Sequence, residues 1–242
     1  MILFRKAILL IHGFAGGNYD YNSLNNDLEL YRDFDVYTFT LPGHDKTIIN
    51  HVTKEDWIKS CEEHVEMLIK RGYKKIYVIG HSMGGVLASH VASKYPQVKK
   101  LVLASPAFRY FTFKNDKLDV LASLKQTPEL FKDYNPTDVI SRLFKTPAGT
   151  TREFMKLVSE HAGDIKNVLC PTLILWGEND IIVPLDSAKY VYNNIKADSV
   201  TLYQIKGVTH DTFRNDRYNE VLSIITLFLR EFNTPGKRIK KI

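Results

Sequence analysis

The feature that most constrains this chain is a glycine-flanked serine between an expected strand and an expected helix. Residues 80–85 read Gly-His-Ser-Met-Gly-Gly, after a β-rich run at 75–80 and before a helical segment that ends at Pro96. A sharp strand-to-helix turn holds such a serine in a strained conformation, with its oxygen projecting from the sheet edge. The glycines leave room for the turn, and the following helix favours negative charge there. The segment predicts a nucleophilic Ser82.

Strands and helices alternate over most of the chain. We expect strands at residues 7–11, 36–40, 75–80, 100–104, 172–176 and 200–205, and helices at 53–71, 84–95, 185–195 and 219–232. This alternation is typical of an α/β fold with a mostly parallel sheet and helices on both faces.

The alternation is interrupted by residues 106–167, which contain no buried-strand run. Short helical patches between prolines predict a small helical cap, or lid. It is rich in aromatic residues, namely Phe108, Tyr110, Phe111, Phe113, Phe131, Tyr134, Phe144 and Phe154. These side chains either line a substrate pocket or pack only among themselves. We therefore expect a core of residues 1–105 and 168–235, a cap at 106–167 and a basic tail at 236–242.

A serine hydroxyl is a poor nucleophile at neutral pH and needs a general base. Of the eight histidines, His210 is the best candidate because it follows the last expected core strand. The base needs an acid that fixes its tautomer. Asp180 lies in the loop after the strand at 172–176, and Glu178 is a rival two residues earlier. Sites in open α/β sheets form at such strand ends.

A glycine-rich loop follows the first expected strand. Residues 12–17 read His-Gly-Phe-Ala-Gly-Gly. Acyl transfer passes through an oxyanion, and backbone N–H groups that bind this charge supply a large part of catalysis. We expect the N–H groups of Phe14 and Met83 to be the donors. The loop has neither the lysine of a P-loop nor the G-x-G-x-x-G of a dinucleotide site.

Together these motifs resemble the α/β-hydrolase superfamily over residues 7–232, apart from the insertion. The match rests on residues 80–85, on His-Gly-Phe at 12–14 and on Trp-Gly-x-x-Asp-x-x-Val-Pro at 176–184. It is most similar to bacterial carboxylesterases and monoacylglycerol lipases, and the resemblance favours Asp180 over Glu178. Such proteins often begin with an additional hairpin, for which six residues before position 7 leave no room, so we expect about six strands.

The resemblance implies a serine hydrolase that cleaves short- to medium-chain esters or monoacylglycerols through an acyl-enzyme on Ser82. The partner would be a small-molecule ester, and no cofactor or metal ion is expected. Thioester hydrolysis and carbon–carbon bond hydrolysis could use the same three residues. A non-catalytic ligand-binding protein with this fold is a further alternative.

Charge and cysteine content limit the other partners. The 33 lysines and arginines exceed the 27 aspartates and glutamates by six, and the four cations among residues 237–241 account for most of this excess. We expect a frayed tail there, with weak contact to anionic lipid as the alternative, and no nucleic-acid binding. Cys61 and Cys170 lack metal-ligand spacing and fit a reducing cytoplasm. We find no signal peptide or membrane span, and the oligomeric state stays open.

Overall fold

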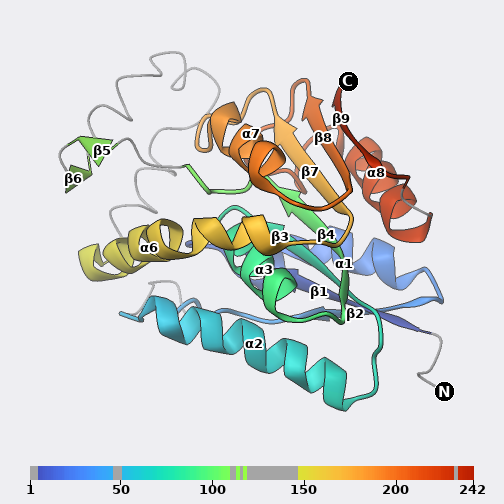
Figure 1. The fold of residues 1–242 in the computed structure, drawn as a ribbon, viewed down its shortest axis with the longest axis horizontal. Helices are drawn as coiled ribbons and strands as arrows, with labels where there is room; N and C mark the ends of the chain where they lie inside the picture. The colour runs from blue at the N-terminus through green and yellow to red at the C-terminus, as the bar shows by residue number, and fades with distance from the viewer. Residues whose placement is uncertain (1–4, 46–50, 110–112, 115–116, 119–146, 232–233) are drawn as a thin grey trace.

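A parallel sheet of seven strands runs through the molecule (Figure 1). The computed structural model describes residues 5–45, 51–109, 113–114, 117–118, 147–231 and 234–242. The strand order is β2-β1-β3-β4-β7-β8-β9. In chain order the strands are β1 (Lys6–Ile11), β2 (Phe34–Thr38), β3 (Ile76–His81), β4 (Val98–Ala104), β7 (Thr172–Gly177), β8 (Ser199–Ile205) and β9 (Gly236–Lys241). The expected α/β fold with a mostly parallel sheet is present, with one more strand than the six expected.

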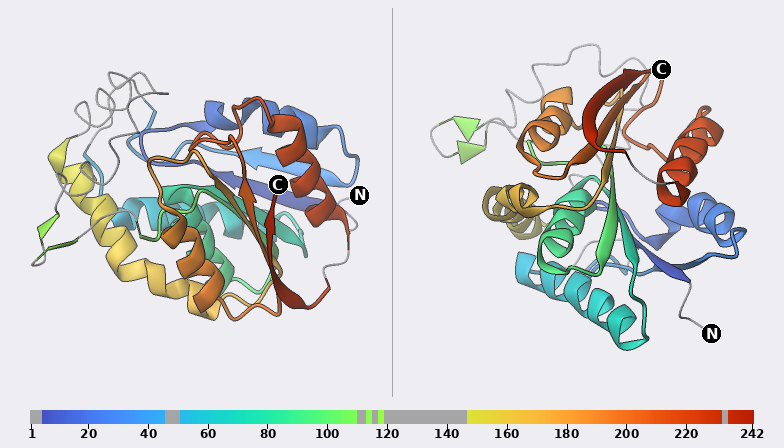
Figure 2. Two further views of the ribbon diagram at one scale, coloured as in Figure 1. Left: turned by 90° about the horizontal axis from the view of Figure 1, so that it is seen from above. Right: turned by 45° about the vertical axis from the view of Figure 1, so that its right-hand side comes forward.

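Helices cover both faces of the sheet (Figure 2). One face carries α2 (Lys54–Lys70), α3 (Met83–Lys94), α6 (Ala148–His161) and α7 (Leu185–Asn194), and the other carries α1 (Asn22–Glu29) and α8 (Tyr218–Arg230). Successive strand residues point to opposite faces, so a strand covered on both sides is apolar throughout. In β1, Leu9 and Ile11 pack in the larger hydrophobic core, on the side of α3. Ile8 and Leu10 pack in the smaller core, on the side of α1 and α8.

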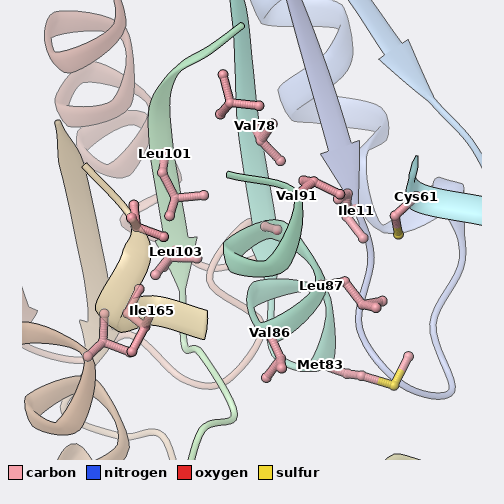
Figure 3. Packing of buried hydrophobic residues seen from close by; sticks show 14 of the residues in the cluster. Ile11, Cys61, Val78, Met83, Val86, Leu87, Val91, Leu101, Leu103 and Ile165 are labelled. Atoms are coloured by element: carbon pink, nitrogen blue, oxygen red, sulfur yellow. The ribbon is translucent and has the colours of Figure 1, made fainter. Parts of the chain in front are cut away.

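Helix α3 lies at the centre of the larger core. Figure 3 shows Val86, Leu87 and Val91 of this helix among the side chains of Ile11 and Leu103. This packing is tight enough that α3, which begins directly after Ser82, has a fixed position on the sheet.

The segment 236–241 is a strand, not the frayed tail that the sequence suggested. It pairs in parallel with β8 from Ser199↔Gly236 to Gln204↔Lys241, and all six of its residues are exposed. Lys237 Nζ donates to the carbonyl oxygens of Tyr192 and Ile195, at 2.9 Å each. An edge strand has one neighbour only, and its charges discourage pairing with another chain.

Part of the predicted cap is described. Its last segment is helical, as expected, and consists of α6 and a 3₁₀ helix, η4 (Ala162–Asn167). The strands β5 (Phe113–Lys114) and β6 (Lys117–Leu118) pair antiparallel, which the sequence did not predict. Of the eight cap aromatics, Phe108 and Phe154 are buried in the core. The side chains of the other six lie outside the described part of the chain.

Ser187 of α7 holds the beginning of the predicted cap. Its Oγ donates to the Pro106 carbonyl at 2.5 Å and accepts hydrogen bonds from the N–H groups of Phe108 at 2.8 Å and Arg109 at 2.9 Å. Because Ser187 is fully buried, these three bonds fix the point at which the chain leaves the core.

Candidate active site

Ser82 occupies the sharp turn between β3 and α3. Its φ of 54° and ψ of −120° lie outside the regions that non-glycine residues usually adopt. The turn is fixed by the bond from Ser82 N–H to the Ala104 carbonyl at 3.0 Å, and the Ser82 carbonyl accepts from Gly85 N–H at 2.9 Å. A Cβ on Gly84 would overlap the carbonyl oxygens of Ile11 and His12, so glycine is required where α3 meets the end of β1.

The glycine-rich loop lies against this turn. The bond from Gly16 N–H to the Gly13 carbonyl, at 3.2 Å, closes a tight turn whose central residues are Phe14 and Ala15. In such a four-residue turn the N–H of the second residue, here Phe14, makes no hydrogen bond within the turn. Met83 is the first residue of α3, and its N–H has no partner within the helix. A Cβ on Gly13 would lie 3.0 Å from Ser82 Cβ, so the two predicted donors lie on segments in contact.

His12 holds the glycine-rich loop in place, a role that the motif alone did not reveal. Its Nδ1 donates to the Gly13 carbonyl at 2.8 Å, and its Nε2 accepts from Leu41 N–H at 2.9 Å. Burial lowers the pKa of His12 to about 3. The ring is therefore neutral, which allows one nitrogen to donate while the other accepts.

Asp180 and His210 form a buried acid–base pair. His210 Nδ1 lies 3.0 Å from Asp180 Oδ2 and 3.2 Å from Oδ1. Asp180 Oδ1 also accepts from the N–H groups of Ile182 at 2.9 Å and Val183 at 2.8 Å, so the carboxylate orientation is fixed. The rival Glu178 is exposed. The geometry favours Asp180 as the partner of His210.

The two groups shift each other's pKa in opposite directions. Burial disfavours charge on both side chains, but mutual attraction outweighs it. The pKa of Asp180 is lowered by His210 and by its hydrogen bonds. The pKa of His210 is raised because Asp180 stabilises the imidazolium. This histidine can therefore accept a proton during a reaction and hold it beside a carboxylate.

His81 connects the His210 loop to the serine turn. Its Nε2 donates to the His210 carbonyl at 2.8 Å, and the two rings lie 4.8 Å apart. Burial and then the neighbouring His210 lower the pKa of His81 to about 4. Within the described residues, no hydrogen bond joins Ser82 Oγ to the His210 ring. Catalytic bonds are often long in free enzymes and tighten when substrate binds.

Gly177 allows the loops that carry Asp180 and His210 to touch. A Cβ at this position would overlap the Val208 carbonyl, and the N–H of Asn179, two residues later, donates to that same carbonyl at 3.0 Å. The sequence signal was the glycine in the Trp-Gly-x-x-Asp segment. Its role became evident only when the Val208 loop was placed beside it.

An aromatic cluster connects the glycine-rich loop to the predicted cap. The Phe14 ring stacks on Phe154 of α6 at 5.0 Å and makes edge contacts with Trp57 at 6.0 Å and His44 at 5.9 Å. His44 Nδ1 donates to the Pro42 carbonyl at 3.0 Å, and its buried Nε2 has no partner among the described residues. Phe154 is thus the predicted cap aromatic that reaches the candidate oxyanion loop.

A known protein family matches this chain from residue 4 to residue 217. This family is described as serine aminopeptidase, S33. The chain belongs to the serine aminopeptidase S33 family.

Two curated relatives are similar to most of this chain. The chain is 25% identical to a carboxylesterase of Bacillus subtilis (strain 168) over 231 residues, which covers 91% of this chain and 92% of that one. It is 26% identical to a thermostable monoacylglycerol lipase of Bacillus sp. (strain H-257) over 217 residues, covering 84% and 82%. The predicted resemblance to carboxylesterases and monoacylglycerol lipases is confirmed.

Two solved structures of lipolytic enzymes have the same fold. One belongs to work on LipS and LipT, two metagenome-derived lipolytic enzymes, with a TM-score of 0.75, 20% identity and 94% coverage of both chains. The other is a monoacylglycerol lipase of Paleococcus ferrophilus, with a TM-score of 0.67, 20% identity and coverage of 92% and 93%.

In the part of the S33 chain that the structure describes, no helix is long and apolar enough to span a membrane.

Proposed function

We propose that this S33-family hydrolase cleaves carboxylic esters through an acyl-enzyme on Ser82. His210 accepts the proton of Ser82 Oγ as that oxygen attacks the acyl carbonyl, and the N–H groups of Phe14 and Met83 bind the oxyanion. His210 then donates this proton to the leaving alcohol. A water molecule attacks the acyl-enzyme by the same route, which releases the acid and restores Ser82.

The observation that carries this proposal is the buried Asp180–His210 bond beside a strained serine turn. Asp180 holds Nδ1 of the imidazole at 3.0 Å, which leaves Nε2 free to act on Ser82. The first turn of α3 adds positive potential where the oxyanion would form. In this proposal the base, the nucleophile and the anion-stabilising groups all lie at the carboxyl ends of β1, β3, β7 and β8.

We infer the substrate class from the relatives and from the aromatic cluster. Short- to medium-chain acyl esters or monoacylglycerols fit a site with Phe14, Phe154 and Trp57 beside the oxyanion loop. Such a substrate is a small uncharged molecule. We assign the reaction to the cytoplasm, since Cys61 and Cys170 are free thiols that suit a reducing compartment.

The test is hydrolysis of p-nitrophenyl esters from acetate to palmitate, with monoacylglycerols assayed in parallel. Ser82→Ala should abolish turnover and labelling by a fluorophosphonate probe. The matched control is Ser89→Ala, which removes a buried serine of α3 whose Oγ donates to the Gly85 carbonyl at 2.9 Å. Activity of Ser82→Ala equal to that of wild type would refute the acyl-enzyme.

The same assay separates the alternatives. Thioesters, peptide amides and dienol-ketones are offered beside the esters at equal concentration. A higher kcat/KM for any of these classes than for every ester would reject ester hydrolysis while retaining Ser82 as nucleophile. Absence of both turnover and probe labelling would favour the ligand-binding alternative.

A further inference from the structure

Two histidines and an aspartate converge on the outer side of α3, away from the candidate active site. His90 lies on α3, His161 is the last residue of α6, and Asp164 lies in η4. Asp164 Oδ2 lies 2.7 Å from His90 Nδ1 and 2.9 Å from His161 Nδ1. One potential ligand atom from each residue lies within 4.8 Å of the other two. His90 follows Ser82 by about two helical turns, roughly 12 Å along the axis.

We propose that this cluster is a zinc site that joins the end of the predicted cap to α3. The ligands are Nδ1 of His90, Nδ1 of His161 and the Asp164 carboxylate, with water in the fourth position. Two imidazole nitrogens and one carboxylate form a donor set that suits Zn²⁺. The ion takes the place of the protons that both rings direct at one carboxylate oxygen.

Two of the three ligand–ligand distances are close to those of a zinc site, and the third, between the two histidine ligand atoms, lies within 4.8 Å. Zinc–ligand bonds of about 2.0–2.1 Å place tetrahedral ligand atoms about 3.3 Å apart. The two nitrogen–oxygen distances, 2.7 and 2.9 Å, therefore need to lengthen by about half an ångström. The side chains of His90, His161 and Asp164 are 15%, 22% and 26% exposed, so water can reach the fourth position.

Glu62 supplies the outer contact that metal-bound histidines usually have. His90 Nε2 lies 2.9 Å from Glu62 Oε1, and Lys94 Nζ holds the same oxygen at 2.6 Å. A carboxylate on the distal nitrogen fixes the tautomer and ring orientation of a ligating histidine. Here it directs His90 Nδ1 toward Asp164 and His161. We expected no metal site from the sequence because that expectation considered only how possible ligands are spaced along the chain.

The site would affect the part of the fold that carries the aromatic cluster. The adjacent Ile165 of η4 packs in the same core as Val86 of α3 and Leu103 of β4 (Figure 3). Helix α6, which ends at the proposed ligand His161, also carries Phe154, and the Phe154 ring stacks on Phe14. A zinc ion at the end of α6 would restrain this helix and stabilise the folded state by a free energy that grows with the logarithm of its affinity.

Calorimetric titration of metal-free full-length protein with zinc chloride tests the site. We expect one zinc ion per chain in the wild type and in Ser82→Ala, so the result does not depend on the proposed reaction. Asp164→Asn and His161→Gln should abolish this binding, and Glu62→Gln should weaken it about 10- to 100-fold. His64→Gln is the matched control, since His64 is a helix histidine whose Nδ1 donates to the Ser60 carbonyl at 2.7 Å.

A second readout uses Co²⁺, whose visible absorption reports nitrogen and oxygen ligands in tetrahedral geometry. The band should appear with wild type and with His64→Gln, and disappear in Asp164→Asn. Circular dichroism of each metal-free variant establishes that it is folded. Zinc binding of equal affinity in wild type, Asp164→Asn and His161→Gln would overturn the proposal. So would the absence of zinc binding by wild type, which would identify the cluster as an ion-pair network only.

Discussion

Three histidines around Ser82 have pKa values shifted in different directions. That of His210 is raised, whereas those of His12 and His81 are lowered to about 3 and about 4. The difference follows from their partners, since His210 faces a carboxylate and the other two contact backbone groups or another histidine. One ring is thus suited to receive a proton, and the other two remain neutral and hold loops.

The raised pKa of His210 predicts the pH dependence of catalysis. In the proposed mechanism His210 must be neutral to act as the base, so kcat/KM should rise with pH through an apparent pKa above the usual value of 6.5. Asp180→Asn should lower this apparent pKa and reduce kcat by about 10⁴-fold, because the imidazolium loses its partner and the tautomer is no longer fixed. Initial rates across a pH series measure both effects. Glu178→Gln is the control, and an unchanged pH profile in Asp180→Asn would contradict the assignment of the acid.

The lowered pKa values of His12 and His81 predict acid sensitivity of the fold. The unfolded chain binds these protons near pH 6.5, whereas the folded chain binds them only near pH 3 to 4. Their stabilising contribution is therefore complete above pH 6.5 and is lost as pH falls toward those values. In His12→Gln, the slope of unfolding free energy between pH 6 and 5 should decrease by about 1 kcal/mol per pH unit.

Urea denaturation at each pH measures this slope. Ser89→Ala, which replaces a buried side chain that does not titrate in this range, should retain the wild-type slope. A slope in His12→Gln equal to that of wild type would show that His12 is not the neutral buried group described above.

Single residues were predictable where their signal is local in sequence. Ser82 lies within six residues that also contain the glycines its turn needs. The structure adds contacts that depend on distant segments, such as Gly177 against Val208 and His12 against Leu41. His90 and Asp164 are separated by 74 positions, so no spacing rule would bring them together.

At the scale of secondary structure, Lys100 of β4 connects the sheet to the end of α8. Its buried Nζ donates to the carbonyl oxygens of Phe228 at 2.7 Å, Leu229 at 3.2 Å and Glu231 at 2.7 Å. The last carbonyls of a helix have no partner within it and carry its negative end. A buried lysine here satisfies them and fixes α8 on the sheet.

Replacing this lysine should destabilise the whole fold. Lys100→Met fills a similar volume but removes the three hydrogen bonds that Nζ donates, and we expect a loss of about 2–3 kcal/mol of unfolding free energy. Urea denaturation measures it, with the exposed Lys99→Met as the neighbouring control. A change below about 0.5 kcal/mol, typical of surface substitutions, would refute the role of Lys100.

Buried strands and amphipathic helices were predictable because burial leaves a periodic pattern. The helix beginning after Thr53 has its apolar residues at helical spacing, and they are buried in α2. Strand β9 was missed because it carries four cations, has no buried face and is exposed throughout. Only pairing with β8 makes it a strand, and pairing is a property of the assembled sheet.

For the molecule as a whole, β9 protects the edge of the sheet. Deleting residues 234–242 should expose the ladder of β8, including Val200 and Leu202, to other chains. Loss of six paired positions, at about 0.5 kcal/mol or more each, predicts a fall in Tm of about 6–12 °C together with aggregation. Calorimetry and light scattering measure these effects. A truncated chain that remains monomeric with the wild-type Tm would contradict this prediction.

Charge reversal on β9 separates its structural role from contact with anionic lipid, the alternative considered for this segment in the sequence analysis. Arg238→Glu and Lys240→Glu lie two residues apart, on one face of the strand, and leave its backbone pairing intact. If the basic strand binds lipid, the double variant should lose liposome binding at low salt and keep its Tm. Equal liposome binding by wild type and the double variant would show that the strand does not bind lipid through these charges.

The place of the predicted cap in the strand order has a consequence for how such chains diversify. It is inserted between β4 and β7, which are neighbours in the sheet. Ser82 and the candidate oxyanion donors precede this insertion, whereas Asp180 and His210 follow it. The entropy of loop closure grows slowly with length, by about 0.6 kcal/mol per doubling. Insertion, deletion or exchange of the cap can therefore alter substrate range during evolution while the residues on both sides keep their positions.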